Sequence, residues 1–243
     1  LHESGRASFE QAHHQLPRRL AQLCVDLGID RFIHMSALQA SKSAPSQYLR
    51  SKAAGESAVN EFSKKLNITI FKPSIIFGRH DSFFNLFARL VKMLPVIVLA
   101  KPDAKFQPIW VEDVTSCMVN ALENTDTYGK TYELGGPQVY TFRELVQKVM
   151  NILGVSRPII GLSDKLSYLQ GFAMEFLPVK LMSRDNVRSM RVDSVTTQGL
   201  APELGVSLMP LEAVVPEYLT NATPRGAYDA FRSAAGRAIN AKR

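Results

Sequence analysis

The hydrophobic positions of the chain alternate between a helical spacing and short continuous runs. Apolar residues three and four apart predict amphipathic helices, and this spacing occurs over residues 16–27, 46–65, 83–93, 112–122 and 142–153. Runs of β-branched and aromatic residues predict strands, and such runs occupy residues 31–36, 68–71, 106–110 and 131–134. This alternating order predicts parallel β-α-β units, so the expected fold is α/β, a doubly wound, Rossmann-like parallel sheet between helix layers.

Residues with capping and turn roles mark the ends of these helices. Gly28 and Gly154 follow the last apolar residues of two helical segments, where glycine commonly ends a helix. Thr141 and Glu144 have the spacing of a capping box, in which each side chain binds the backbone N–H of the other residue. The two acids at 112–113 open another helix and suit the positive end of its dipole, which explains them without a catalytic role.

The pattern divides the chain into three parts. Residues 1–155 carry the alternating helices and strands, and residues 156–220 are predicted to form a C-terminal helical cap or partner region. Within it, residues 163–182 are poor in charge and predict either a helix pair that covers a cleft or an interfacial surface. Several apolar side chains of this stretch are interpreted as core: Met174, Phe176, Leu177, Leu181 and Met182. Residues 221–243 lose the apolar periodicity and are interpreted as a tail.

Composition narrows the class of protein. Of 243 residues, 46% are hydrophobic and 21% are charged, which is ordinary for a soluble globular protein. The longest apolar stretch, 94–100, is far below the ~20 residues of a membrane span, and no secretory signal is recognised at Leu1. Cys24 and Cys117 are too few for a disulfide scaffold or a cysteine zinc site, and both are expected to fill the core. The five histidines lack the helical spacing of a metal site, so no metal is expected.

The net charge of +7 is concentrated towards the C-terminus. With Asp229 as the acid, a net charge of +4 falls in the last twenty residues, from five basic side chains: Arg225, Arg232, Arg237, Lys242 and Arg243. Such a tail either binds anionic lipid, nucleic acid or an acidic partner surface, or is simply solvated. Nucleic acid is not expected as a partner, because no aromatic-rich strand motif or zinc-finger spacing accompanies the charge.

One short motif carries candidate chemistry. Tyr48 and Lys52 lie four residues apart in a predicted helix, twelve residues after Ser36 at the end of a predicted strand. Residues at this spacing share a helix face, so the Lys52 ammonium can lie over the Tyr48 phenol and is expected to lower its pKa. The alternative is that Tyr48 anchors the helix start and Lys52 is solvated. His34 shares a strand face with Ser36 and is interpreted as a satisfied core or cleft histidine.

A second segment is expected at the same end of the sheet. Ligands of open α/β sheets bind beyond the carboxyl ends of the strands. Ser36 and the turn at Pro73 follow two predicted strands, so we expect both segments to meet at one site.

Longer stretches carry a resemblance to a known family. In order along the chain, they are Ser36, Tyr48 with Lys52, and residues 71–78, 108–114 and 132–137. The chain therefore resembles the extended and atypical short-chain dehydrogenase/reductases, which include NAD-dependent epimerases and dehydratases, over residues 9–155. Within that group, residues 46–56 and 72–79 are similar to the NAD(P)H-binding accessory subunit of respiratory complex I and its bacterial relatives.

The resemblance implies roles for individual residues. Ser36 would position a carbonyl, Tyr48 would exchange a proton, and Lys52 would hold the nicotinamide ribose. The turn after the second strand would line the nicotinamide with Lys72, Pro73, Ser74, Ile75 and Ile76. The implied cofactor is NAD or NADP, with NADPH slightly favoured. Residues 1–155 would then be the C-terminal part of a NAD(P)-binding domain with interleaved segments of a small domain.

The chain departs from the family in one respect. It contains no Gly-x-x-Gly-x-x-Gly or Gly-x-Gly-x-x-Gly motif, the loop that cradles the dinucleotide pyrophosphate at a helix N-terminus. We therefore expect a fragment, or a sequence whose upstream strands are not included. Such a chain is expected to hold a dinucleotide weakly or not at all.

Two functions stay open on this resemblance. The first is a nucleotide-bearing accessory or assembly factor linked to NADH:ubiquinone oxidoreductase (complex I) or another quinone-linked assembly. Such a protein would be cytoplasmic, at the inner face of a bacterial membrane with peripheral membrane contact, or on the mitochondrial matrix side. The alternative is an active NAD(P)-dependent oxidoreductase or epimerase that acts on a carbonyl or sugar-like substrate. Whether the chain is an enzyme is left open.

Overall fold

The computed structural model describes residues 8–176 and 181–220. The α-helices are α1 (Leu16–Asp26), α2 (Gln47–Asn60), α3 (Ser82–Met93), α4 (Val111–Asn120), α5 (Phe142–Leu153), α6 (Asp164–Met174), α7 (Arg184–Ser189) and α8 (Leu211–Leu219). A π-helix, η1 (Glu10–Gln15), precedes α1, and two 3-10 helices are η2 (Thr125–Thr127) and η3 (Pro202–Leu204). The strands are β1 (Arg31–Met35), β2 (Asn67–Pro73), β3 (Ile76–Phe77), β4 (Ile97–Leu99), β5 (Lys105–Phe106), β6 (Ile109–Trp110), β7 (Thr131–Leu134), β8 (Tyr140–Thr141) and β9 (Ile159–Gly161).

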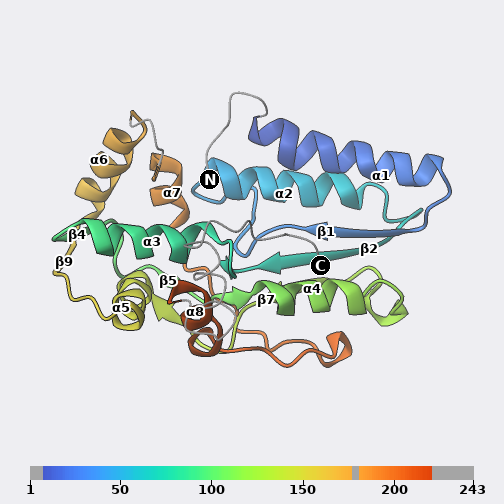
Figure 1. Cartoon of the computed structure of the whole chain (residues 1–243). Helices are drawn as coiled ribbons and strands as arrows, with labels where there is room; N and C mark the ends of the chain where they lie inside the picture. Colours follow the sequence, from blue (N-terminus) through green and yellow to red (C-terminus); the bar gives the residue numbers. More distant parts are fainter. Residues whose placement is uncertain (1–7, 177–180, 221–243) are drawn as a thin grey trace, which may run out of the picture.

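A parallel sheet with the strand order β1-β2-β7 lies between two helix layers. Figure 1 shows α1 and α2 on one face of this sheet and α4 on the other. Side chains of β2 alternate between the two faces, as a strand requires. Ile68 and Ile70 pack in one apolar cluster with Val59 of α2, whereas Phe71 packs with Val114 of α4. The predicted α/β fold with a parallel sheet is confirmed.

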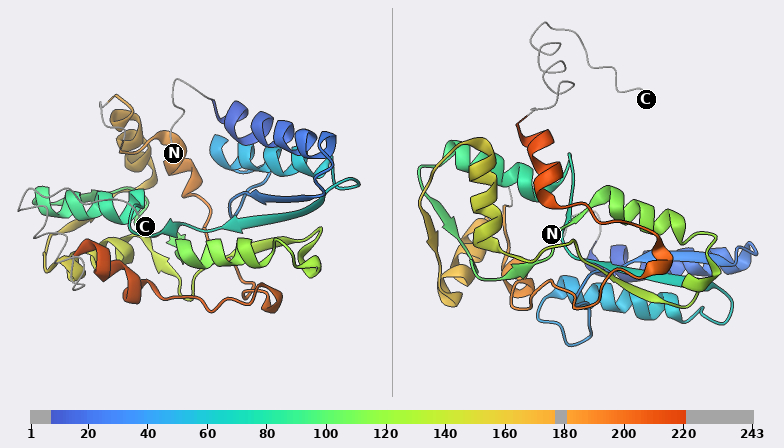
Figure 2. Two further views of the ribbon diagram at one scale, coloured as in Figure 1. Left: turned by 45° about the vertical axis from the view of Figure 1, so that its right-hand side comes forward. Right: turned by 90° about the horizontal axis from the view of Figure 1, so that it is seen from below.

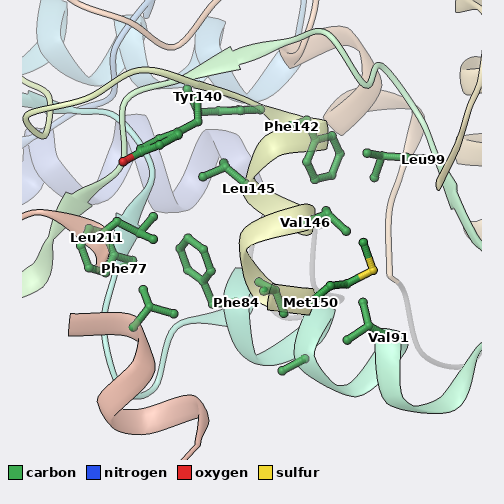
Figure 3. Close-up of a cluster of buried hydrophobic side chains, with 14 of the residues drawn as sticks. Phe77, Phe84, Val91, Leu99, Tyr140, Phe142, Leu145, Val146, Met150 and Leu211 are labelled. Carbon is green, nitrogen blue, oxygen red and sulfur yellow. The ribbon is translucent and has the colours of Figure 1, made fainter. Parts of the chain in front are cut away.

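A second packing unit lies beside the three-stranded sheet (Figure 2). Helices α3, α5 and α8 surround a core in which Phe84, Leu145 and Met150 are fully buried, as Figure 3 shows. Two small sheets border this core, one of β4 with β9 and one of β5 with β8. The strand β3 pairs with β6 and leads from the three-stranded sheet into this unit.

The predicted helix ends are largely correct. Gly28 and Gly154 have φ values of +70° and +65°, the left-handed conformation that glycine adopts without strain. Thr141 and Glu144 form both hydrogen bonds of the capping box that begins α5. Helix α2 is shorter than predicted, because residues 61–65 form turns rather than helix.

The predicted strand over residues 106–110 is wrong as a single element. Residue 106 ends β5 and residue 109 begins β6, and these two strands belong to different sheets. Between them, Pro108 has no N–H to donate to a ladder. The N–H of Gln107 instead donates to the carbonyl of Ser194 at 3.1 Å, so the chain changes sheet at this point.

The apolar stripe of α1 does not face the core. Leu16, Leu20, Leu23 and Leu27 are between 45% and 66% exposed. The buried contact of α1 is made by Ala21, next to Cys24 and Val25, against the α2 side of the sheet. Cys117 is fully buried as expected, whereas Cys24 is only half-buried.

The core interpretation of residues 174–182 is wrong for Phe176, which is 74% exposed. Met174, Leu181 and Met182 are half-buried, and Leu177 lies outside the described residues, as does the basic tail over 221–243. Leu166, Leu169 and Phe172 of α6 are also exposed. In the described part of the chain, no helix combines the length and apolar character that a membrane crossing requires.

Candidate functional site

Tyr48 and Lys52 lie in the first two turns of α2, at the carboxyl end of β1. The helix begins after Ser46, whose side chain accepts a hydrogen bond from the Leu49 N–H at 3.2 Å. Lys52 reaches back to the sheet, where its Nζ donates to the carbonyl of Met35, the last residue of β1, at 3.2 Å. The Lys52 ammonium is thus next to the strand end from which Ser36 emerges.

Ser36 is buried and held by both neighbouring elements. Its N–H donates to the Phe71 carbonyl of β2 at 2.7 Å, and its Oγ donates to the Glu56 carboxylate of α2. Glu56 also forms an ion pair with Lys72 at 3.3 Å. The ends of β1 and β2 and one face of α2 therefore share a polar network of Ser36, Glu56 and Lys72.

Glu56 is the site residue to which the sequence analysis gave no role. It follows Lys52 by four residues, so Tyr48, Lys52 and Glu56 form one stripe along α2. The spacing was available as a signal in the sequence. Its importance depends on Lys72, which comes from the next strand and which helical spacing alone does not place nearby.

Tyr48 is enclosed by aromatic rings of η1. Its ring meets the edges of Phe9 and His13, with centroids 6.1 Å and 5.5 Å away, and Phe9 stacks on His13 at 5.3 Å. Burial raises the pKa of Tyr48 to about 12. The expected lowering of this pKa by Lys52 is wrong for this structure, because loss of hydration disfavours the phenolate more than a cation one turn away favours it.

Burial also lowers the pKa values of the basic side chains around the site. It lowers the pKa of Lys52, and Glu56 partly opposes this effect. The pKa of His13 and that of His34 are both lowered to about 4, first by burial and then by the charge of Lys52. His13 Nδ1 lies 2.8 Å from Ser51 Oγ, whereas the buried His34 Nε2 has no hydrogen-bond partner among the described residues. Both imidazoles are therefore neutral at pH 7.

The turn after β2 lies at the same end of the sheet, as predicted. Lys72 donates to the Ala40 carbonyl at 3.3 Å in addition to its ion pair with Glu56. Pro73 ends β2 and is buried. Ser74 Oγ donates to the Ser194 carbonyl at 2.7 Å, so this hydroxyl joins the turn to the C-terminal region.

Two residues of the predicted turn lead away from this network. Ile75 packs on the core of the second unit, and its carbonyl accepts from the Ile109 N–H at 2.9 Å. Ile76 begins β3 and is half-buried. The contact of all five turn residues with a nicotinamide stays a prediction.

Gln107 supports the turn and was missed by the sequence analysis. Its backbone N–H donates to Ser74 Oγ at 3.2 Å, its Nε2 donates to the Gly136 carbonyl at 2.8 Å, and its Oε1 accepts from the Thr196 N–H at 3.0 Å. The Gln107 side chain thus connects the end of β7 with the C-terminal region, and its backbone N–H binds the turn after β2. The proline at position 108 was the only local feature of the sequence that could have indicated this role of Gln107.

A cavity of the structure lies apart from this network, and no candidate metal site is found in the described residues. Residues 8–176 and 181–220 contain no group of three or more His, Cys, Asp or Glu side chains placed to hold a metal ion. A cavity of about 460 Å³ lies between residues 76–81, residues 110–112 and α8. Its lining includes none of Ser36, Tyr48 and Lys52.

Comparisons with known proteins show the family of the chain. The model of the NAD dependent epimerase/dehydratase family matches residues 2–135. The chain is 32% identical over 223 residues to the mitochondrial NADH dehydrogenase (ubiquinone) 1 alpha subcomplex subunit 9 of Arabidopsis thaliana, covering 88% of this chain and 54% of that protein. It is 38% identical over 152 residues to the subunit of the same name from Mus musculus, covering 62% of this chain and 40% of that protein. The chain thus spans about half, or less, of the length of these relatives.

Solved structures share the fold. The structure of a DesIV double mutant, a dTDP-glucose 4,6-dehydratase from Streptomyces venezuelae with NAD and DAU bound, superposes with a TM-score of 0.64. It is 19% identical in sequence, and the match covers 93% of this chain and 70% of that one. At this identity the likeness supports the doubly wound architecture.

Proposed function

Because the chain belongs to the NAD dependent epimerase/dehydratase family, we propose that the network at the carboxyl ends of β1 and β2 is the nicotinamide side of a dinucleotide site. The observation that carries the proposal is the stripe of Tyr48, Lys52 and Glu56 along α2, in which Lys52 binds the last residue of β1 and Glu56 binds both Ser36 and Lys72. In this proposal residues 1–155 supply the dinucleotide side, and residues 156–220 form a partner region.

The residues fit a nicotinamide ribose. A lysine ammonium has three N–H donors, and one Lys52 donor binds Met35 within the described chain. The others would hold ribose hydroxyls, while the turn at residues 72–76 would line the nicotinamide ring. Bound NAD(P)H would supply a hydride at this place. NADPH is the form we propose, from the resemblance of residues 46–56 and 72–79 to NAD(P)H-binding accessory subunits.

We propose that the protein works as a nucleotide-bearing accessory or assembly subunit linked to complex I. The relatives from Arabidopsis thaliana and Mus musculus are subunits of NADH dehydrogenase (ubiquinone), which supports this role. Bound dinucleotide would then stabilise the fold by mass action without turnover.

The proposed location is a membrane-bound complex, at the inner face of a bacterial membrane or on the mitochondrial matrix side. Exposed apolar side chains of α6 and of the turn after it support contact with a partner or a membrane surface there: Leu166, Leu169 and Phe172 in α6, and Phe176 in the turn. Large exposed apolar patches commonly mark such contacts.

A second candidate is an active NAD(P)-dependent oxidoreductase or epimerase on a carbonyl or sugar-like substrate. The proximity of Ser36 and Lys52 at one strand end, with Tyr48 one turn away on α2, favours it. The two candidates differ in their need for the Tyr48 hydroxyl. If the protein is an oxidoreductase, a Tyr48→Phe variant would lose turnover. If it is an accessory subunit, the variant would keep the wild-type abundance of complex I.

The experiment introduces Lys52→Met into the chromosomal gene of the organism that makes the protein. Lys65→Met is the control, because Lys65 is an exposed lysine just after α2. We expect Lys52→Met to lower the dinucleotide content of the purified protein by about tenfold or more, the effect of losing charge-assisted hydrogen bonds. Complex I abundance on native gels would fall in parallel, and Lys65→Met would behave as the wild type. Equal dinucleotide content in both variants would contradict the proposed site.

A further inference from the structure

The start of α2 has backbone donors that the helix itself cannot satisfy. The side chain of Ser46 accepts from the Leu49 N–H, as described above. The two preceding N–H groups are bound from outside the helix by Asp185 of α7. Its Oδ1 accepts from Gln47 at 2.8 Å, and its Oδ2 accepts from Tyr48 at 3.0 Å. The first turn of the helix that carries Tyr48 and Lys52 thus depends on a residue 137 positions away in sequence.

A carboxylate suits this place for two reasons. Both of its oxygens accept hydrogen bonds, so one side chain binds two neighbouring N–H groups. Its negative charge is also stabilised by the positive end of the helix dipole. Asparagine has nearly the same shape but only one acceptor oxygen, and its amide N–H would face one of the two backbone donors.

Asp185 is itself held by α6. Its own helix begins with a capping box formed by Ser183 and Asn186. The neighbouring Arg184 binds Glu175, at the end of α6, through its backbone N–H at 2.9 Å and its guanidinium at 2.8 Å. Polar contacts therefore link the C-terminal end of α6 to Arg184 of α7, and the next residue of α7, Asp185, binds the first turn of α2.

We propose that Asp185 is a positioning residue for the Tyr48 and Lys52 site, through which the α6–α7 segment acts on that site. Tyr48 is bound at its backbone N–H by Asp185 and at its ring by η1, so its placement depends on both ends of the described chain. A partner that contacts α6 would tighten or loosen the start of α2. That the site binds a dinucleotide rests on the proposed function. That Asp185 fixes the first turn of α2 does not.

The test compares Asp185→Asn and Asp185→Glu with Asp193→Asn in the full chain. Asp193 is a matched control, because its carboxylate also accepts from a backbone N–H, that of Lys105 at 3.0 Å, away from α2. We expect Asp185→Asn to speed hydrogen exchange at the amides of Gln47 and Tyr48 about tenfold, the size of a lost helix cap. Asp185→Glu restores protection, and Asp193→Asn leaves it unchanged.

NADPH titration by fluorescence, on the same variants, separates positioning from a merely structural role. Weaker NADPH binding in Asp185→Asn, regained in Asp185→Glu, supports the proposal. The proposal is overturned if hydrogen exchange at Gln47 and Tyr48 is unchanged in Asp185→Asn. It is also overturned if that exchange changes while the NADPH affinity does not. An equal rise of exchange in all helices of Asp185→Asn and Asp193→Asn would overturn it as well. The titration uses protein expressed from the chromosomal copy, because a chain without the glycine-rich loop is expected to bind a dinucleotide weakly or not at all. If that wild-type protein binds no NADPH while exchange changes as expected, the hold on α2 stands and the proposed function fails.

Discussion

Tyr48, His13 and His34 lie around the Lys52 ammonium, and burial shifts the pKa of each ring. The sequence predicted the types and spacing of the site residues, because a strand end followed by a Tyr-x-x-x-Lys helix is a local pattern. It did not predict their ionisation. The pKa of Tyr48 depends on the hydration that Phe9 and its neighbours remove, and η1 is brought to α2 by tertiary packing.

Replacing His34 tests how burial sets the charge of this site. In the folded state its pKa is about 4, below its ordinary value of 6.5, so the unfolded chain takes up the proton first as the pH falls. The stability contributed by neutral His34 is present above pH 6.5 and is lost as the pH falls towards 4. We expect His34→Leu to reduce this loss by about 1.4 kcal/mol for each unit of pKa shift removed.

Urea unfolding of both proteins at pH 6.5 and at pH 4 measures this effect. At pH 6.5 the variant is expected to stay within about 1.5 kcal/mol of the wild type, because the buried ring is replaced by a side chain of similar volume. His13, with a lowered pKa of its own, keeps part of the pH dependence in the variant. An identical fall in stability in both proteins would contradict the assignment.

Helices and strands were predicted well where the pattern is local, and less well where distant contacts decide. The capping box at Thr141 and the helix ends at Gly28 and Gly154 were predicted correctly, because each depends on residues close together in the sequence. The strand over residues 106–110 was divided because Gln107 bonds to Ser194, a residue far along the chain. The hold of Asp185 on α2 could not be predicted either, since no periodicity relates residues so distant in sequence.

The outward leucines of α1 give a prediction for this element. Leu20 and Leu23 are 45% and 50% exposed, so their replacement by glutamate removes little packing. We expect Leu20→Glu with Leu23→Glu to change the free energy of unfolding by about 0.5 kcal/mol or less at each position. Self-association at high concentration is expected to fall, because an exposed apolar stripe is replaced by charge.

Urea unfolding and light scattering check both effects. Ala21→Leu is the control on the same helix, because Ala21 is fully buried and a larger side chain there costs about 1–3 kcal/mol. A large destabilisation by the two glutamates, comparable to that of Ala21→Leu, would mean that the leucine stripe is covered in solution.

Across the whole molecule, the segment from residue 183 to residue 218 ties the two packing units together. Ser194 and Thr196 bind the turn after β2 through Ser74 and Gln107. Further along, the Tyr218 hydroxyl of α8 donates to Asp81 at the start of α3 at 2.8 Å. The contacts of Ser194 and Thr196 reach the turn after β2, so the shape of the proposed site depends on the C-terminal region as well as on the Tyr48 motif.

Asp113 provides the sharpest test of this long-range support. The helix dipole suits both acids at 112–113, but the buried Asp113 also accepts from the backbone N–H of Met209 at 2.8 Å. Asp113→Ala leaves that N–H without its acceptor, so we expect a loss of about 1–3 kcal/mol in the free energy of unfolding. Glu112→Ala, at an exposed acid of the same turn, is expected to cost about 0.5 kcal/mol or less. Urea unfolding measures the stability of both variants, and hydrogen exchange at Met209 reports the lost hydrogen bond. Equal effects of the two variants would mean that the helix dipole alone explains both acids.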